Sequence, residues 1–261
     1  MAAKYSSVLA NARVLVIGGS SGIGFCVAEH ALTLGASVVV SSSRQPKVDA
    51  ATQRLQQSVP GAGDRINGHV CDLSDAATIR PNLASLLDAA SRPGVLDHIV
   101  FTAGNPIAIR PVGELSTEQI TNMGNVRFLA PLFLGGLAAQ HMRHSARSSI
   151  TLTSGSMIQR PMPNWTATAA YGSGTEGVMR GLAVDLAPIR VNVVSPGAIR
   201  TEMFDEIPAD KLDSVMDMYR KASLTDTVGT PEEASEAYVY LMRCAFATGT
   251  TVSVDGGRLL K

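Results

Sequence analysis

The sequence predicts an α/β domain in which helices flank both faces of a doubly wound parallel sheet. Short apolar runs alternate with longer segments of helical spacing, and neither a repeat nor a linker interrupts this alternation. Strands that alternate with helices pair in parallel, and right-handed crossovers place the helices on both faces of the sheet. The predicted strands are residues 14–17, 37–40, 66–70, 98–101, 149–152, 190–194 and 250–254, and the predicted helices include 48–58, 76–90, 116–143, 169–187 and 231–243.

Length and composition narrow the class of protein. At 261 residues the chain can bury one large core, and we expect a single domain over residues 1–261. Its 22 basic and 22 acidic residues balance, which gives no electrostatic basis for binding nucleic acid or acidic membranes. The three cysteines show neither metal-ligand spacing nor a disulfide framework, so we expect no metal site. Without a secretory signal or an apolar run of the ~20 residues that cross a bilayer, the sequence predicts a soluble, cytoplasmic protein.

The first predicted strand and the turn after it are the most informative elements. Residues 14–17 form a buried strand, and Gly18, Gly22 and Gly24 follow before an apolar-periodic helix at 25–34. In such a turn the first glycine permits the sharp bend, the second admits a pyrophosphate and the third lets the helix pack on the strand. The helix N-terminus then offers N–H groups to an anion. The alternative is a tight strand-to-helix turn with no ligand.

One segment breaks the alternation of strands and helices. Residues 200–228 follow the end of a predicted strand, where ligands of doubly wound sheets bind. We expect this segment to form an apolar lid over a substrate, with a surface helical pair that covers the core as the alternative. The apolar residues in the segment include Met203, Phe204, Met216, Met218 and Tyr219.

Six motifs, in the correct order, resemble those of the short-chain dehydrogenase/reductase superfamily over essentially the whole chain. They are Gly-Gly-Ser-Ser-Gly-Ile-Gly at 18–24, Cys-Asp-Leu at 71–73, Thr-Ala-Gly at 102–104, Asn-Val-Arg at 125–127, Arg-Val-Asn-Val-Val-Ser-Pro-Gly at 190–197 with Thr201, and Val-Asp-Gly-Gly at 254–257. The resemblance implies a Rossmann-type sheet, a nicotinamide cofactor, a small-molecule substrate and a homodimer or homotetramer. It also implies a catalytic Asn125 and cofactor contacts from Gly18, Ser20, Ser21, Gly22, Ile23, Gly24, Asp72, Ala103, Gly104, Pro196, Gly197 and Thr201.

The end of the second strand predicts which nicotinamide cofactor is used. An acidic side chain there would bond the ribose 2′-hydroxyl and repel a 2′-phosphate. This chain instead has Ser42, Ser43 and Arg44, and hydroxyls with a guanidinium suit a phosphate monoester. We therefore expect NADP(H) rather than NAD(H). The alternative is a polar loop with a solvated arginine.

The proton machinery of the superfamily is incomplete in this chain. The resemblance implies a Ser, a Tyr and a Lys four residues after the Tyr, but Thr175 stands four residues after Tyr171. An ungapped alignment of the following helix places the Tyr position on Thr168 and the Lys position on Gly172. Tyr171 then serves either as a displaced acid or as a helix-packing residue. After the fifth strand, Ser154 is preferred for the Ser position, with Ser156 as the alternative.

A fungal branch of these reductases in natural-product pathways resembles this pattern. Some members reduce iminium or aldehyde intermediates, and some also guide cyclisation. An acidic residue that cyclising members use ahead of the single Trp corresponds to Met162 here. We therefore expect an NADPH-dependent oxidoreductase that acts on a carbonyl or iminium group of a small secondary-metabolite intermediate. The alternatives are a nucleotide-binding cyclase or isomerase without net redox chemistry, and a catalytically silent scaffold.

Overall fold

A parallel sheet forms the centre of the protein, and the computed structural model describes residues 9–107 and 109–261. In this part of the chain the sheet has seven strands in the order β3-β2-β1-β4-β5-β6-β7. The order changes direction between β1 and β4, which confirms the doubly wound topology. The strands are β1 (Arg13–Ile17), β2 (Ser37–Ser42), β3 (Ile66–Val70), β4 (His98–Phe101), β5 (Ser149–Thr153), β6 (Arg190–Pro196) and β7 (Thr251–Val254).

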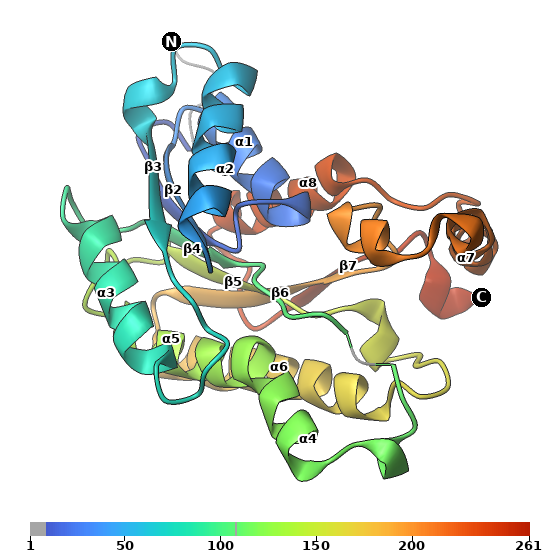
Figure 1. Ribbon diagram of the computed structural model, residues 1–261. Helices are drawn as coiled ribbons and strands as arrows, with labels where there is room; N and C mark the ends of the chain where they lie inside the picture. Colours follow the sequence, from blue (N-terminus) through green and yellow to red (C-terminus); the bar gives the residue numbers. More distant parts are fainter. Residues whose placement is uncertain (1–8, 108) are drawn as a thin grey trace.

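Helices cover both faces of the sheet, as the alternation of elements predicts. Helices α1, α2 and α8 lie on one face, and α3, α5 and α6 lie on the other (Figure 1). Helices α4 and α7 lie away from the centre of the sheet (Figure 1). The bounds are α1 (Gly22–Thr33), α2 (Gln45–Ser58), α3 (Ile79–Ser91), α4 (Thr117–Gly124), α5 (Ala130–Ala138), α6 (Thr166–Asp185), α7 (Ala209–Ala222) and α8 (Pro231–Arg243).

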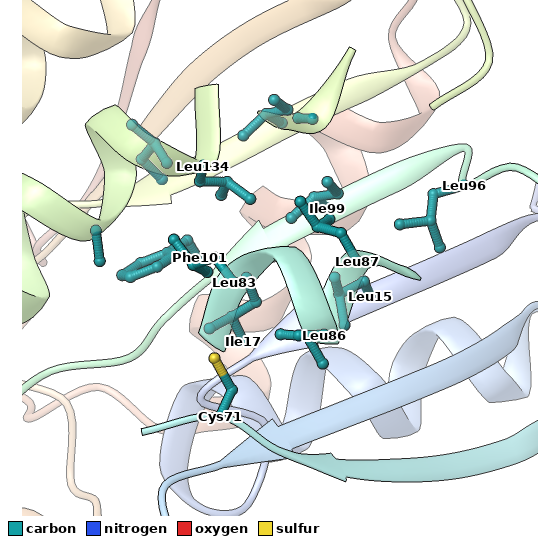
Figure 2. Close-up of a cluster of buried hydrophobic side chains, with 14 of the residues drawn as sticks. Leu15, Ile17, Cys71, Leu83, Leu86, Leu87, Leu96, Ile99, Phe101 and Leu134 are labelled. Carbon is teal, nitrogen blue, oxygen red and sulfur yellow. The ribbon is translucent and has the colours of Figure 1, made fainter. Parts of the chain in front are cut away.

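Each face of the sheet has its own hydrophobic core. Successive side chains of a strand point to opposite faces, so Leu15 and Ile17 enter one core while Val14 and Val16 enter the other. Figure 2 shows the first core, in which leucines of α3 pack against β1 and β4. The sulfur of Cys71 points into this cluster, and burial raises the pKa of its thiol to about 12. That cysteine is therefore an apolar core residue rather than a thiolate.

The helix expected over residues 116–143 is interrupted in the structure. Helix α4 begins at a capping box, in which the hydroxyl of Ser116 accepts from the backbone of Gln119 and the Gln119 side chain accepts from the backbone of Ser116. A π-helical turn at Asn125–Leu129 then separates α4 from α5. Such turns insert one extra residue into a helix and are frequent at functional sites.

The predicted lid segment, residues 200–228, contains two helical pieces. A 3₁₀ turn at Glu202–Glu206 precedes α7, and none of the residues described in α7 is buried. The ring of Phe204 meets the ring of Tyr219 edge to face, with centroids 5.8 Å apart. The segment leaves the sheet next to the carboxyl end of β6 and lies near the C-terminus (Figure 1). Its movement as a lid stays a prediction.

The described residues show no sign of a membrane span or a metal centre. In this part of the chain no helix has both the length and the apolar character that a bilayer crossing requires. The same residues contain no group of three or more His, Cys, Asp or Glu side chains that is arranged to hold a metal ion.

Candidate functional site

The glycine-rich turn between β1 and α1 forms one wall of the site. Gly18 has a φ of +90°, and a Cβ there would lie 2.4 Å from the backbone nitrogen of Ala103. A Cβ on Gly24 would lie 2.3 Å from the carbonyl oxygen of Gly18. Gly22, with a φ of +50°, begins α1, whose first N–H groups have no partner within the helix. The turn thus combines the close packing and the N–H donors that a diphosphate requires.

A cavity of about 580 Å³ lies at the carboxyl edge of the sheet. Ser154 lines it, and so do all but one of the residues predicted to contact the cofactor. Those residues are Gly18, Ser20, Ser21, Gly22, Ile23, Gly24, Ser42, Ser43, Asp72, Ala103, Gly104, Pro196, Gly197 and Thr201. The structure therefore brings together residues that span most of the chain.

A lysine in the first turn of α2 lies close to the polar end of β2. The hydroxyl of Ser20 donates to that of Ser42 over 2.9 Å, and Ser43 lies beside them in the cavity lining. Lys47, in the first turn of α2, lines the same region. Arg44 is exposed at the N-cap of α2 and is not among the lining residues. The structure thus places Lys47, rather than Arg44, in the cavity wall.

The opposite end of the cavity lacks room for the missing lysine. A Cβ on Gly172 would lie 2.3 Å from the Cγ2 atom of Ile158. The carbonyl oxygen of Gly172 accepts from the hydroxyl of Ser154 over 3.2 Å. Thr168, one turn earlier on α6, lines the cavity with a buried hydroxyl that has no hydrogen-bond partner among the described residues. This end therefore presents hydroxyl groups, and an apolar side chain fills the space where a lysine would begin.

Tyr171 is directed away from the cavity. Its hydroxyl donates to the carbonyl oxygen of Ile120 over 2.8 Å, so the residue ties α6 to α4. Its ring lies so close to Gly124 that a Cβ there would approach the ring to 2.4 Å, and the ring of Phe128 is 6.0 Å away. Tyr171 is absent from the cavity lining. This geometry is that of a helix-packing tyrosine, the second of the two roles that the sequence leaves open.

The π-helical turn directs its two polar residues to different places. The Asn125 side-chain nitrogen donates to the carbonyl oxygen of Ser74 over 2.8 Å, and Asn125 is buried outside the cavity lining. Arg127 reaches the cavity, where its Nη2 atom donates to the carbonyl oxygen of Asn105 over 2.7 Å. The structure thus brings Arg127 into the site, whereas Asn125 connects the turn to the loop after β3.

The start of the lid segment covers the glycine-rich turn. The Oε2 atom of Glu202 accepts from the backbone N–H of Gly22 over 2.9 Å. The methyl group of Thr201 lies 3.0 Å from the position of a Cβ on Gly22. Met203 and Phe204 continue the lining of the cavity from this side. An acidic side chain therefore occupies the helix N-terminus at the predicted diphosphate site.

Comparisons with known proteins agree with this fold. A family model described as an SDR-like Rossmann domain matches residues 5–261. The chain belongs to the short-chain dehydrogenase/reductase (SDR) family. Among its relatives, the short-chain dehydrogenase/reductase malC of Malbranchea aurantiaca is 39% identical over 259 residues, with 97% of each chain covered. The short-chain dehydrogenase/reductase fsr5 of Gibberella fujikuroi is 40% identical over 259 residues, with 98% of each chain covered.

Solved SDR structures extend the comparison. The structure of MalC Reductase/Diels-Alderase from Malbranchea aurantiaca superposes with a TM-score of 0.94 at 38% identity, covering 99% of this chain and 100% of that chain. A small-chain dehydrogenase in complex with NADPH gives a TM-score of 0.78 at 25% identity, covering 96% of this chain and 100% of that chain. A Burkholderia cenocepacia short chain dehydrogenase in complex with NADP gives 0.82 at 25% identity, covering 96% and 98%.

Two charged residues of the cavity wall, Lys47 and Arg127, are not among the predicted site residues. Lys47 lies three residues after Arg44, in the first turn of α2, so a second cation this close to the end of β2 was a usable signal. Arg127 is two residues after Asn125, a spacing that predicts opposite directions in a regular helix, and the two side chains do bond to different partners. Arg127 lies within the π turn, and nothing in the hydrophobic pattern of the sequence indicates such a turn.

Proposed function

We propose that the protein binds NADP(H) and reduces a carbonyl or iminium group of a small secondary-metabolite intermediate. One observation carries the proposal: a single cavity joins the glycine-rich turn to a set of hydroxyl groups beside Ser154, without a tyrosine or lysine at the expected positions. The site thus has the glycine-rich turn that binds the cofactor in SDR enzymes, and it has hydroxyl groups where those enzymes have the tyrosine and lysine that transfer a proton.

The residues present fit the cofactor. A Cβ at Gly18 or Gly24 would fill the space that the turn leaves, and α1 directs its N-terminus toward the same region. None of the five residues directly after β2 is acidic, while Ser43 and Lys47 line that end of the cavity. A hydroxyl and an ammonium group suit the 2′-phosphate of NADP(H). The complexes of two neighbouring SDR structures with NADPH and NADP agree with this choice.

The missing tyrosine and lysine restrict the reaction. The bound cofactor would supply a hydride. Reduction of an iminium carbon neutralises an existing cation and needs no acid, whereas reduction of a carbonyl leaves negative charge on oxygen that needs a donor. Ser156 and Thr168 offer buried hydroxyls in the cavity wall that have no partners among the described residues. The chain can therefore orient a polar substrate, and orientation alone lowers a barrier by several kcal/mol.

The test of this proposal is cofactor turnover with chemically defined substrates. Purified protein is mixed with NADPH and a panel of cyclic iminium ions, quinones and aldehydes, and NADPH oxidation is followed together with the products. Transfer of deuterium from labelled NADPH to the product identifies a true reduction. We expect turnover with at least one class and a strong preference for NADPH over NADH. Equal affinity for the two cofactors, or deuterium absent from every product, would contradict the proposal.

A second candidate function is cyclisation without net redox chemistry. The solved structure that superposes with a TM-score of 0.94 is that of a Reductase/Diels-Alderase, and this similarity favours the candidate. Against it, Met162 stands where cyclising members have an acidic residue, and Met162 is not among the cavity-lining residues. Product formation without NADPH oxidation would select the cyclase. Tight NADPH binding without any turnover would favour a scaffold.

We also propose that the protein assembles into a homodimer or homotetramer. Large apolar side chains are exposed on two neighbouring helices: Val184 of α6 is 77% exposed and Leu132 of α5 is 41% exposed. Single exposed apolar residues are ordinary, but exposed apolar residues on both helices are consistent with a surface that a second copy covers. Sedimentation at micromolar concentration tests this, and a monomer would contradict it.

A further inference from the structure

The cavity wall contains a half-buried cation, Arg127, without an acidic partner. The two acids in the lining, Asp72 and Glu202, each accept a backbone N–H instead. Arg127 forms no ion pair with any residue that the structure describes. The other cations of the lining lie elsewhere: Lys47 is at the end next to β2, and Arg258 donates to the carbonyl oxygens of Ser156 and Arg160. The charge of Arg127 is therefore available to a ligand.

The surroundings of Arg127 hold its guanidinium in place. The group lies against Gly104, where a Cβ would be 2.6 Å from Nη2, and this Nη2 atom donates to the carbonyl oxygen of Asn105. A guanidinium has five N–H donors, so the bond to Asn105 leaves others unused. Desolvation lowers the pKa of Arg127 from its ordinary value, but an arginine stays protonated at neutral pH. A desolvated cation without an anion is costly, and an anionic or polarised ligand oxygen would relieve this cost.

Unpartnered polar atoms elsewhere in the cavity wall point to the same kind of ligand. The Oδ1 atom of Asn105, the Oγ atom of Ser156 and the Oγ1 atom of Thr168 are buried without hydrogen-bond partners among the described residues. Buried polar atoms in folded proteins are normally paired, so each unpaired atom calls for an explanation. A polar ligand in the cavity would provide partners for these atoms. Thr168 also stands at the aligned position of the family's proton donor.

We propose that Arg127 binds an oxygen of the substrate that carries negative charge or acquires it during reduction. This inference rests on the proposed function and narrows its substrate class to carbonyl compounds and to zwitterions that carry such an oxygen. A simple iminium cation without one would be repelled by Arg127. In the reduction of a carbonyl, its carbon gains the hydride, the π electron pair moves to oxygen and water supplies the proton. The guanidinium stabilises the charge on oxygen in place of the absent tyrosine and lysine.

Two other roles for Arg127 make different predictions. If the residue binds the cofactor, its removal weakens NADP⁺ binding. If it only ties the loop at Asn105 to the π turn, its removal lowers stability but leaves the charge preference for ligands unchanged. A role in binding substrate oxygen predicts a charge preference that depends on Arg127 and survives, in part, in a lysine variant.

The experiment measures the binding of three probes of similar shape and different charge. Benzoate, benzamide and benzylammonium are titrated by calorimetry into the protein saturated with NADP⁺. Wild type is compared with Arg127→Gln, Arg127→Lys and the control Arg180→Gln, which removes an exposed cation from α6. We expect wild type and the control to bind benzoate most tightly and benzylammonium least. In Arg127→Gln the ratio of benzoate affinity to benzamide affinity should be roughly tenfold smaller than in wild type, and Arg127→Lys should keep part of this preference.

Three results would overturn the inference. They are equal binding of the three probes by wild type, a benzoate preference that persists in Arg127→Gln, and an NADP⁺ affinity of that variant that falls by the same factor as its benzoate affinity. If Arg127→Gln does not fold, the order of the probes in wild type and Arg127→Lys decides the question. If the protein binds no NADP⁺ at all, the proposed function fails, and titrations without cofactor still test Arg127.

Discussion

Replacement of Glu202 by glutamine should tighten the binding of NADPH. The Glu202 carboxylate accepts the N–H of Gly22 over 2.9 Å, at the N-terminus of α1 where the cofactor's diphosphate is expected to bind. A diphosphate that binds there must displace the carboxylate and then tolerate its negative charge nearby. Glutamine has the same shape without the charge. The substitution Glu202→Gln therefore weakens the side-chain bond that competes with the diphosphate for the N–H of Gly22, and it removes the repulsion between the carboxylate and the diphosphate.

The size of this effect follows from two modest contributions. Glu202 is exposed, so its bond at the helix N-terminus contributes about 0.3–1 kcal/mol, in the range for an anion at an exposed helix end. Repulsion between the carboxylate and one diphosphate charge at ~4 Å costs about 1 kcal/mol in a water-like environment. Together they amount to roughly 1–2 kcal/mol, which corresponds to an NADPH affinity about 5–30-fold tighter.

The single tryptophan of the chain provides the assay. Trp165 is buried in the cavity wall, so energy transfer from its ring to bound NADPH reports occupancy directly. Titrations of wild type and Glu202→Gln are compared with Asp210→Asn, an exposed acid of the same lid segment. An unchanged or weaker affinity in Glu202→Gln would refute the reasoning. Equal tightening in Asp210→Asn would show that net charge, rather than the contact with Gly22, controls affinity.

Four further outcomes are expected from the structure. Gly172→Lys should destabilise the protein by about 1–3 kcal/mol in urea unfolding because its Cβ meets Ile158 at 2.3 Å, and a second substitution Ile158→Ala should recover part of the loss. Tyr171→Phe should keep activity within about twofold but lose about 1 kcal/mol of stability with its bond to α4, and a ~100-fold loss of activity would restore the tyrosine as an acid. Lys47→Ala should weaken NADPH roughly tenfold and leave NADH unchanged in the same fluorescence titration. Burial lowers the pKa of His98 to about 4, below the value of ~6.5 expected in the unfolded chain. The contribution of neutral His98 to stability is therefore complete above pH ~6.5 and falls by up to roughly 3 kcal/mol toward pH ~4. A free energy of unfolding that stays flat over this pH range in wild type would contradict the assignment.

The sheet and its glycine-rich turn were predictable because their signals are local. The apolar runs at 14–17 and 98–101 match β1 and β4 within one residue, and the carboxyl ends of parallel strands must share one edge of the sheet. The cavity lining then follows, since the loops after successive strands meet at that edge. Gly18 and Gly24 have the close contacts that their motif implies because only glycine leaves room for the crossing backbone.

The end of the cavity near Ser154 and Gly172 was less predictable, because the directions of its side chains depend on helix geometry that composition does not encode. An ungapped alignment places the lysine position on Gly172, but it gives no direction for the Tyr171 ring, which packing against α4 decides. Arg44 carried the expected charge, yet α2 begins immediately after it and directs the later Lys47 to the cavity. These directions come from tertiary contacts, which a single sequence does not display.

The π-helical turn at Asn125–Leu129 lets one stretch of chain both pack α5 in the core and direct Arg127 to the cavity. Beyond it, α5 packs against α3 in the core shown in Figure 2, while Arg127 within it faces the cavity. In an unbroken α-helix each added residue rotates everything after it by about 100°, so a change of direction for one side chain would disturb the whole following helix. A bulge confines that rotation to a single turn. A substitution at Arg127 would therefore alter what the site presents while the packing of α5 remains intact, whereas the neighbouring Val126, Phe128 and Leu129 belong to the core or pack against it.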